Sequence, residues 1–247
     1  MDAVRIEHDI PYHGDLTMDL YRPPDSKPGA RLPAVVFVLG YSDLGAERTL
    51  GCKFKEMESY ITWAKLIAAL GLIGITYENH DPLGDLDALF KHIQENAEAL
   101  GIDERRIGLW SCSGNVPRAL DALMQKRDFK CAALCYGLTL DLDGATGVAE
   151  AAMMWRFANP TAGKSVRDLP PELPLFIARG GCDEVPQLNE ALDRFIAHAL
   201  AANLPLTIAN HPSGPHAFDL VDNSETSREI VRRILGFLRS HLAVQPA

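Results

Sequence analysis

The segment 106–115 constrains the fold more than any other part of this 247-residue chain. It begins as a short apolar run and ends in a cluster of small residues, Ser111-Cys112-Ser113-Gly114-Asn115. A strand that turns sharply into a helix presents one side chain at the helix N-terminus, where amide groups favour an anion. The segment therefore predicts a strand, a tight turn and a helix. The helical residues share one apolar face: Val116, Ala119, Leu120, Leu123 and Met124.

Ser113 fits the tip of this turn better than its neighbours do. The tip residue adopts strained backbone, at a cost on the order of 1–3 kcal/mol, and the residues two before and two after it must be small. With Ser113 at the tip, those positions hold Ser111 and Asn115. Cys112 at the tip would bring the bulky Trp110 into the tight position, and Ser111 at the tip would bring Leu109 there. An ordinary strand–helix junction is the alternative interpretation. We predict that the turn is a nucleophile elbow with Ser113 as the nucleophile.

Two later strand ends supply partners for Ser113 in the order that such a site requires. That order along the chain is nucleophile, acid, base. Asp183 follows the apolar run 173–178, and His216 follows the apolar run 204–209. Functional residues of open α/β sheets gather past the carboxyl ends of the strands. We therefore predict that Asp183 orients His216, which takes the proton from Ser113.

Other residues compete for these roles. Asp183 also suits the cap of the helical run that follows it, and its neighbour Glu184 is an alternative acid. His211 is the nearest rival base, but it falls before the turn 212–215, too close to the strand to reach back. His80 precedes the elbow in the chain and is expected at the rim of a pocket or in a loop.

These segments resemble the α/β-hydrolases, and within that superfamily they are similar to the dienelactone-hydrolase-like group. The resemblance rests on the elbow around Ser113, on Gly-Gly-Cys-Asp-Glu-Val-Pro around Asp183 and on Pro-His-Ala-Phe-Asp around His216. It departs from the family in three ways. Dienelactone hydrolases proper have a cysteine at the tip, both elbow glycines are replaced here, and the usual His-Gly after the third strand is Leu39-Gly40. The first departure argues against true dienelactone chemistry.

An enzyme that transfers acyl groups needs amide donors for the negative charge that develops on the substrate oxygen. The amide of Gly114, directly after the nucleophile, is one predicted donor. The amide of Tyr41 is the other, because Gly40 lets the backbone turn there after the third strand. A plain strand-ending turn is the alternative for this pair. The residues predicted to contact substrate are Gly40, Cys112, Met154, Trp155 and His80.

Strand and helix patterns alternate along the chain, which indicates an α/β fold whose sheet is mostly parallel and covered by helices on both faces. The α/β-hydrolase resemblance implies eight strands. The predicted strands are 3–10, 16–22, 33–39, 71–77, 106–112, 131–136, 173–178 and 204–209. A C-terminal helix is expected to open with a capping box of Thr226 and Glu229.

The whole chain, 1–247, is expected to fold as one domain. The connection 137–171 is unusually long for a compact domain and is predicted to be a lid or binding insert. It contains a short apolar helix predicted over 148–157, which would cover the acyl side of the pocket or, as the alternative, only pack on the body of the domain. The segment 41–58 is predicted to be a loop that forms a second wall of the pocket.

Composition narrows the possible partners. The net charge is −9 and no basic residues cluster, so nucleic acid and anionic membranes are not expected to bind. No segment has the apolar length of a membrane span, and the start shows no apolar region of a signal peptide. The five cysteines lack the spacing of a metal site and are expected to be reduced thiols, which favours the cytoplasm. No metal or cofactor is expected, and the oligomeric state stays open between monomer and homodimer.

Together with the resemblance, these residues predict a serine hydrolase that cleaves carboxylic esters or lactones through an acyl-enzyme on Ser113. Its expected partner is a small-molecule ester or lactone. A peptidase or a thioester hydrolase would use the same three side chains. A non-catalytic ligand-binding module on the same scaffold is the alternative from another class, because a fold does not fix a function.

Overall fold

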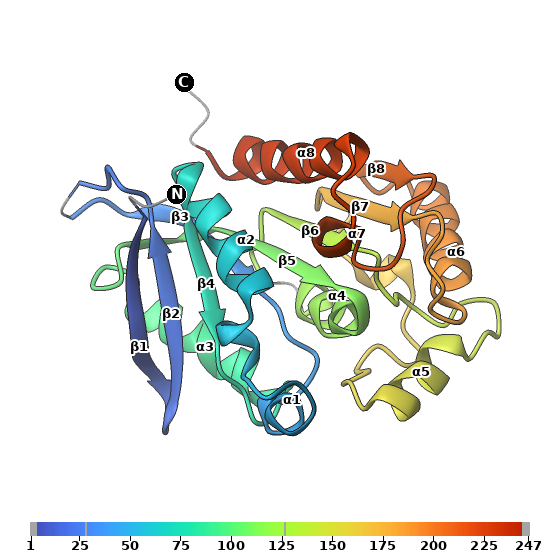
Figure 1. The fold of residues 1–247 in the computed structure, drawn as a ribbon, viewed down its shortest axis with the longest axis horizontal. Coiled ribbons are helices and arrows are strands. Elements are labelled where there is room, and N and C mark those ends of the chain that lie inside the picture. Colours follow the sequence, from blue (N-terminus) through green and yellow to red (C-terminus); the bar gives the residue numbers. More distant parts are fainter. Residues whose placement is uncertain (1–3, 28, 126, 244–247) are drawn as a thin grey trace.

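The computed structural model describes residues 4–27, 29–125 and 127–243. Its strands form one eight-stranded sheet in the order β1-β2-β4-β3-β5-β6-β7-β8 (Figure 1). Strand β2 is antiparallel to β1 and to β4, and all other neighbours are parallel. The predicted mostly parallel sheet is confirmed. The strands are β1 Arg5–His13, β2 Leu16–Arg22, β3 Leu32–Phe37, β4 Ile73–Tyr77, β5 Ile102–Cys112, β6 Cys131–Cys135, β7 Leu175–Gly180 and β8 Leu206–His211.

Helices cover both faces of this sheet (Figure 1). Trp63 of α2 packs on Trp110 of β5, with ring centroids 5.0 Å apart, and Leu242 of α8 approaches Gly108 of the same strand. Positions 108 and 110 share one side of the strand, so α2 and α8 lie on the same face. The helices are α1 Asp43–Leu50, α2 Glu58–Ala69, α3 Gly84–Glu95, α4 Val116–Met124, α5 Gly147–Trp155, α6 Leu188–Ala201, α7 Phe218–Val221 and α8 Glu225–Leu242.

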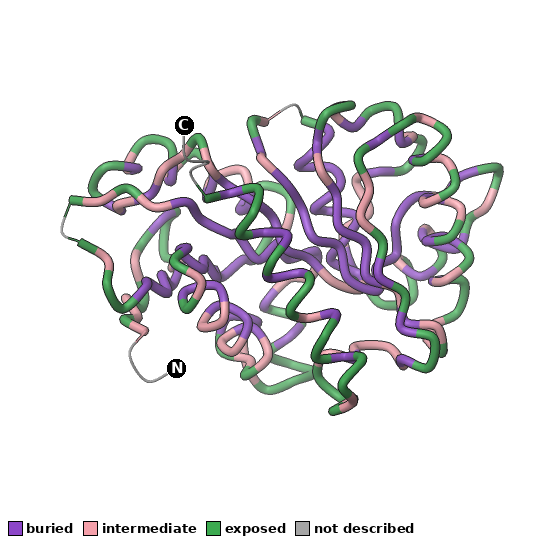
Figure 2. The backbone as a smooth tube through the Cα atoms, turned by 90° about the horizontal axis from the view of Figure 1, so that it is seen from above, coloured by how far each residue is buried: buried purple, intermediate pink, exposed green. Residues whose placement is uncertain are grey.

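The core follows the central strands. Every residue of β4 and β6 is buried, and buried backbone runs along the middle of the molecule in Figure 2. Parallel strands that are covered on both faces read as continuous apolar runs rather than as alternating patterns. This burial explains why the sequence shows these strands as short, uninterrupted apolar segments.

Some predicted boundaries shift in the structure. Strand β1 continues to His13, three residues past its predicted end, and the predicted first residue, Ala3, lies outside the described residues. Strands β7 and β8 each begin two residues later than predicted and end two residues later. Asp183 and His216 still follow the ends of β7 and β8.

The predicted capping box of the C-terminal helix was wrong. The N-cap of α8 is Ser224, whose side chain accepts a hydrogen bond from the amide of Ser227 at 3.2 Å. Thr226 and Glu229 both lie inside the helix. Ser224 has the extended backbone that an N-cap requires, so the helix begins before the threonine.

The two segments predicted as pocket walls contain more regular structure than expected. The segment 41–58 holds α1 and a short 3₁₀ turn, η1 (Phe54–Glu56). The insert 137–171 holds α5 and a second such turn, η3 (Val166–Asp168). Helix α5 ends at Trp155, two residues earlier than predicted, because Arg156 adopts a left-handed conformation with φ of 61°. None of the described helices combines the length and apolarity needed to cross a bilayer.

Candidate active site

Ser113 lies at the turn where β5 passes into α4. Its φ of 55° is in the left-handed region, which a non-glycine residue occupies only where its surroundings enforce it. A single 3₁₀ turn, η2 (Ser113–Asn115), connects the strand to the helix. Ser111 is fully buried, and its hydroxyl donates to the carbonyl of Val38 at 3.3 Å. The strained tip of the turn is therefore Ser113.

The side chains of Ser113, His216 and Asp183 form a continuous hydrogen-bonded chain. Ser113 Oγ lies 2.9 Å from His216 Nε2, and His216 Nδ1 lies 2.7 Å from Asp183 Oδ2. The Asp183 side chain has no exposed surface, whereas that of His216 is 30% exposed. These residues follow the carboxyl ends of β5, β8 and β7, which meet at one edge of the sheet. The structure thus brings together the three residues that the sequence singled out.

The competing residues lie apart from this chain of contacts. Glu184 is exposed. His211 is the last residue of β8, and its Nε2 lies 3.0 Å from Asp222 Oδ2 and 3.3 Å from Ser224 Oγ. His80 is exposed in the segment before α3. In this geometry His211 supports the start of α8 and makes no contact with Ser113 Oγ.

The backbone after β3 turns at Gly40, directly beside the elbow. A Cβ at position 40 would lie 2.8 Å from the carbonyl oxygen of Gly114 and 3.0 Å from Asn115 Cα, so a side chain has no room there. No hydrogen bond within the described part of the chain uses the amide of Tyr41. This amide and that of Gly114 belong to the two segments that meet at the elbow. The predicted oxyanion donors therefore lie on adjacent segments, and their role stays a prediction.

Aromatic rings cover Gly114. The Tyr41 ring packs against Phe54 and Phe157, with centroid distances of 6.0 and 5.7 Å. A Cβ at position 114 would collide with the Tyr41 hydroxyl and would lie 2.8 Å from Phe157 Cδ1. Burial raises the pKa of Tyr41 to about 12, so its phenol stays neutral near pH 7. These rings form an apolar wall beside Ser113.

The predicted pocket residues of α5 lie mainly at the surface. Met154 is 70% exposed and Trp155 is 37% exposed. Phe157, just past the end of the helix, is instead the residue that reaches Tyr41. Contact of Met154 and Trp155 with a substrate stays a prediction.

Cys112 directly precedes Ser113, and its thiol is expected to react slowly. Its Sγ is 4.0 Å from the hydroxyl of Tyr60 and 4.0 Å from Nδ2 of Asn115. Burial, with a smaller contribution from the charge of Asp219, raises the pKa of the Cys112 thiol to about 12. A protonated thiol is a poor nucleophile. Among the described residues, no group of three or more His, Cys, Asp or Glu side chains is placed to hold a metal ion.

A second carboxylate, Asp219, lies near His216 and was not predicted from the sequence. Asp219 accepts hydrogen bonds from the Tyr136 hydroxyl at 2.7 Å and from Trp63 Nε1 at 2.8 Å. The Tyr136 ring meets the His216 ring edge-on, with centroids 5.1 Å apart. Burial raises the pKa of Asp219, although both hydrogen bonds oppose that rise. Their positions in the sequence could have pointed to this pair, because Tyr136 directly follows β6 and Asp219 lies three residues after His216.

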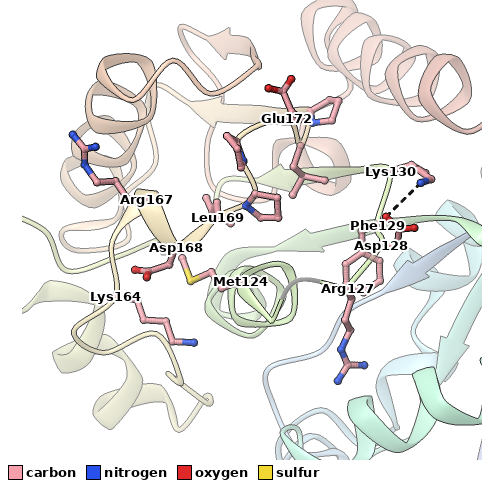
Figure 3. A pocket seen from close by; sticks show the side chains of 14 residues that line it. Met124, Arg127, Asp128, Phe129, Lys130, Lys164, Arg167, Asp168, Leu169 and Glu172 are labelled. Atoms are coloured by element: carbon pink, nitrogen blue, oxygen red, sulfur yellow. Dashed lines mark ion pairs between the residues drawn. The ribbon is translucent and has the colours of Figure 1, made fainter.

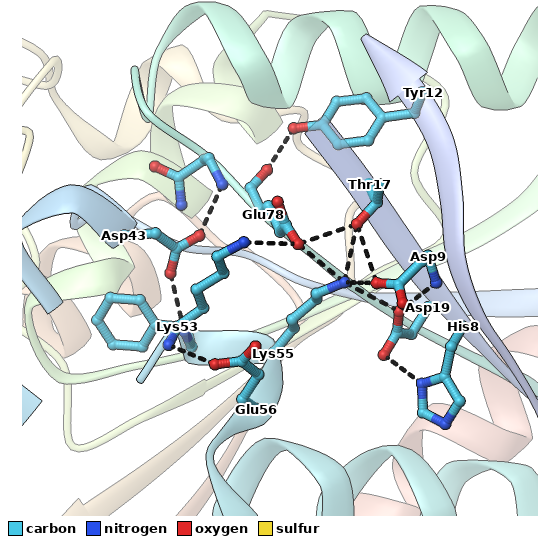
Figure 4. Close-up of polar contacts among 12 residues, drawn as sticks. His8, Asp9, Tyr12, Thr17, Asp19, Asp43, Lys53, Lys55, Glu56 and Glu78 are labelled. Atoms are coloured by element: carbon cyan, nitrogen blue, oxygen red, sulfur yellow. Dashed lines mark hydrogen bonds and ion pairs between the residues drawn. The ribbon is translucent and has the colours of Figure 1, made fainter. Parts of the chain in front are cut away.

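A partly buried ionic cluster supports the segment that carries Tyr41 (Figure 4). Asp43 accepts hydrogen bonds from the amides of Phe54 at 2.8 Å and Asn79 at 2.7 Å. The neighbouring ammonium group of Lys55, with its side chain only 4% exposed, lies within 3.3 Å of three carboxylates: Asp9, Asp19 and Glu78. Because a buried charge must be paired, this cluster fixes η1 against the N-terminal hairpin and β4.

Two cavities lie outside the Ser113–His216 contact. One of about 840 Å³ lies at the amino ends of β6 and β7, around Phe129 and Pro170 (Figure 3), so it is at the opposite edge of the sheet from Ser113. The other, of about 370 Å³, lies between α2, α7 and α8 and is lined partly by Trp63 and Asp219. Only this second cavity reaches a residue next to the candidate site.

The chain resembles known proteins in its fold. No protein-family model and no curated protein matches the chain. Among solved structures, it is similar to vibralactone cyclase, with a TM-score of 0.72 and 17% identity over 98% of this chain and 82% of that one. It is also similar to a thermophilic esterase from the Planctomycetes species Thermogutta terrifontis, with a TM-score of 0.66 and 17% identity over 99% and 95% of the two chains.

A third similar structure is LAE6, an alpha/beta hydrolase enzyme from the metagenome of Lake Arreo, Spain. Its TM-score is 0.72, with 18% identity over 96% of this chain and 82% of that one. The likeness covers nearly the whole chain in all three cases. The chain therefore has the α/β-hydrolase fold.

Proposed function

We propose that the chain is a serine hydrolase that cleaves carboxylic esters or lactones through an acyl-enzyme on Ser113. The observation that supports this most strongly is the hydrogen-bonded chain from Ser113 Oγ through His216 to the buried carboxylate of Asp183. A strained serine beside a neutral imidazole is activated as a nucleophile when the imidazole accepts its proton.

The first half of the proposed reaction forms the acyl-enzyme. His216 Nε2 takes the proton as Ser113 Oγ attacks the ester carbonyl carbon. The carbonyl oxygen becomes an oxyanion that accepts hydrogen bonds from the amides of Gly114 and Tyr41. Asp183 stabilises the imidazolium, which then gives its proton to the departing alcohol as the carbon–oxygen bond breaks.

The second half regenerates the enzyme. A water molecule attacks the acyl carbon while His216 takes its proton, and the carboxylic acid leaves as Ser113 recovers its hydrogen. A lactone would follow the same steps, except that its alcohol stays attached to the acyl group. The apolar wall of Tyr41 and Phe157 supports an uncharged acyl group beside Ser113. No step uses a cofactor.

We also propose the subgroup, the cellular compartment and the size of the substrate. The dienelactone-hydrolase-like subgroup is proposed from the segments around Ser113, Asp183 and His216. All five cysteines are free, which supports a reducing compartment such as the cytoplasm. A small-molecule substrate suits a site where the rings of Tyr41 and Phe157 lie beside the nucleophile.

The test combines turnover with covalent labelling. Wild type and Ser113→Ala are assayed on nitrophenyl esters of two- to ten-carbon acids, on a lactone, on a thioester and on a peptide anilide. A fluorophosphonate probe is then mapped by peptide mass spectrometry, with Ser111→Ala as the matched control. We expect one label per chain, on Ser113, in wild type and in Ser111→Ala. Label on Ser111, or no label together with no turnover, would contradict the proposal, and preference for the thioester or the anilide would correct its substrate class.

A further inference from the structure

Asn115 stands where the nucleophile elbow usually has a glycine. Its side chain is buried, with 3% of the residue exposed. Asn115 Oδ1 accepts a hydrogen bond from the amide of Gly40 at 2.7 Å, and its Nδ2 donates to the Tyr60 hydroxyl at 3.2 Å. Because an amide N–H can only donate, the atom that faces Gly40 must be the carbonyl oxygen of the side chain. A glycine at this position would make neither contact.

A second hydrogen bond holds Gly40 from its carbonyl side. The amide of Ala158, in the insert after α5, donates to the carbonyl oxygen of Gly40 at 2.7 Å. That carbonyl and the N–H of Tyr41 belong to one peptide group, which is planar and trans. Its C=O and N–H therefore point in opposite directions. Fixing the Gly40 carbonyl on Ala158 turns the Tyr41 N–H to the other side.

We propose that Asn115 is a positioning residue of the oxyanion hole. With Ala158, it clamps Gly40 on its N–H and its C=O, and so fixes the direction of the Tyr41 amide. This inference rests on the proposed function, in which that amide binds the oxyanion. Asn115, which replaces the usual glycine, thus helps to hold the Tyr41 amide in position before the substrate binds.

The clamp works because an oxyanion donor must be aimed before the charge appears. Removing one such donor lowers kcat by roughly 10²–10³-fold, and a displacement of about 1 Å costs roughly 10²-fold. Without the Asn115 side chain, Gly40 keeps its close approach to the elbow but loses the acceptor for its N–H. The Tyr41 amide would remain present and be less well aimed, so the loss should be smaller than that of a removed donor.

The experiment compares Asn115→Ala with Thr139→Val. Thr139 is fully buried and donates one hydrogen bond to the carbonyl of Ala191 on α6, at 3.0 Å. Thr139→Val therefore removes a buried side-chain hydrogen bond, as Asn115→Ala does, but leaves the contacts of Gly40 intact. Both variants, wild type and Ser113→Ala are measured for ester turnover, for inhibition by a trifluoromethyl ketone and for hydrogen exchange at the amide of Gly40.

In Asn115→Ala we expect kcat/KM to fall about 10–100-fold, mainly through kcat. Affinity for the ketone should fall by the same factor, because its adduct with Ser113 Oγ places an oxyanion on the same amides. The Gly40 amide should exchange about fivefold faster or more, since its acceptor is gone. In Thr139→Val all three quantities should stay within about threefold of wild type.

Equal losses in Asn115→Ala and Thr139→Val, or an unchanged Gly40 exchange rate, would overturn the clamp. Failure of the proposed function looks different, because wild type and Ser113→Ala would then turn over esters equally or not at all. The exchange measurement still decides the clamp in that case, because it requires no catalysis.

Discussion

The carboxylate of Asp183 is fully buried and lies 2.7 Å from His216 Nδ1, while Glu184, the next residue, is exposed to solvent. One of two adjacent acids therefore faces the imidazole and the other faces water. Asp183 Oδ1 also accepts a hydrogen bond from the amide of Val185 at 3.0 Å, which fixes the carboxylate in the loop after β7.

The acid of the triad is testable by two isosteric changes. Asp183→Asn should lower kcat by roughly 10⁴-fold while the fold is retained, because a neutral amide neither holds the right tautomer of His216 nor stabilises its charged form. Glu184→Gln should stay within about threefold of wild type, as expected for an exposed side chain. Steady-state kinetics on a nitrophenyl ester with circular dichroism as the folding control would decide this, and a crippled Glu184→Gln beside a mild Asp183→Asn would reverse the assignment.

The base is tested by comparing two histidines at the same end of β8. His216→Ala should abolish nearly all turnover, because no other imidazole contacts Ser113 Oγ in the described structure. His211→Gln should keep activity within about tenfold and lower the Tm, since the ring is buried against Asp222 and Phe218. Turnover and thermal melts of both variants are the measurement. Loss of activity in His211→Gln with an unchanged Tm would point to His211 as the base instead.

Thiol reactivity follows from the pKa of Cys112. Burial raises that pKa to about 12, so the thiolate is scarce at pH 8. Cys182, in contrast, is exposed. Iodoacetamide at pH 8 should therefore label Cys182 at least tenfold faster than Cys112 in the folded protein, and turnover should survive the first label. Peptide mapping over time checks the order, and unfolding in urea provides the control in which both cysteines react. Fast labelling of Cys112 that tracks loss of activity would favour a thiol nucleophile.

Stability should depend on pH through Asp219. Burial raises its pKa, so the folded state holds the proton more tightly than the unfolded state does. The stability that the protonated group contributes is present at low pH and is lost as the pH rises from its ordinary value of about 3.9 through the raised value. Asp219→Asn removes the buried charge and can still pair with Tyr136 and Trp63.

We therefore expect the difference in Tm, Asp219→Asn minus wild type, to be several degrees higher at pH 8 than at pH 4.5. Asp103→Asn is the control. Burial alone would raise the pKa of Asp103, but contacts that include the hydrogen bond from Arg106 at 2.6 Å lower it, and arginine stays charged at both pH values, so the Tm deficit of this variant should change little between them. Thermal melts at both pH values check the prediction, and a pH-independent difference for Asp219→Asn would contradict it.

The sequence by itself determined the architecture and the three central residues. Apolar periodicity is a local property, so the alternation of strands and helices and the turn at Ser113 were readable in short windows. The order of Ser113, Asp183 and His216 was readable because parallel strands put their carboxyl ends at one edge. The capping box at Thr226 was wrong for the opposite reason, since several serines and threonines near a helix start compete and only the backbone decides among them.

Tertiary structure alone decided which distant groups meet. Asp219 pairs with Tyr136 and Trp63, which are 83 and 156 positions away, and Asn115 meets Gly40 from 75 positions away. The contact between Asn115 and Gly40 depends on the pairing of β3 with β5, because the two residues follow the carboxyl ends of these strands. All three contacts are single, directed hydrogen bonds between buried groups, which leave no periodic trace in the chain. Such bonds are set by the folded geometry, because a buried polar group must find its partner wherever packing has placed one.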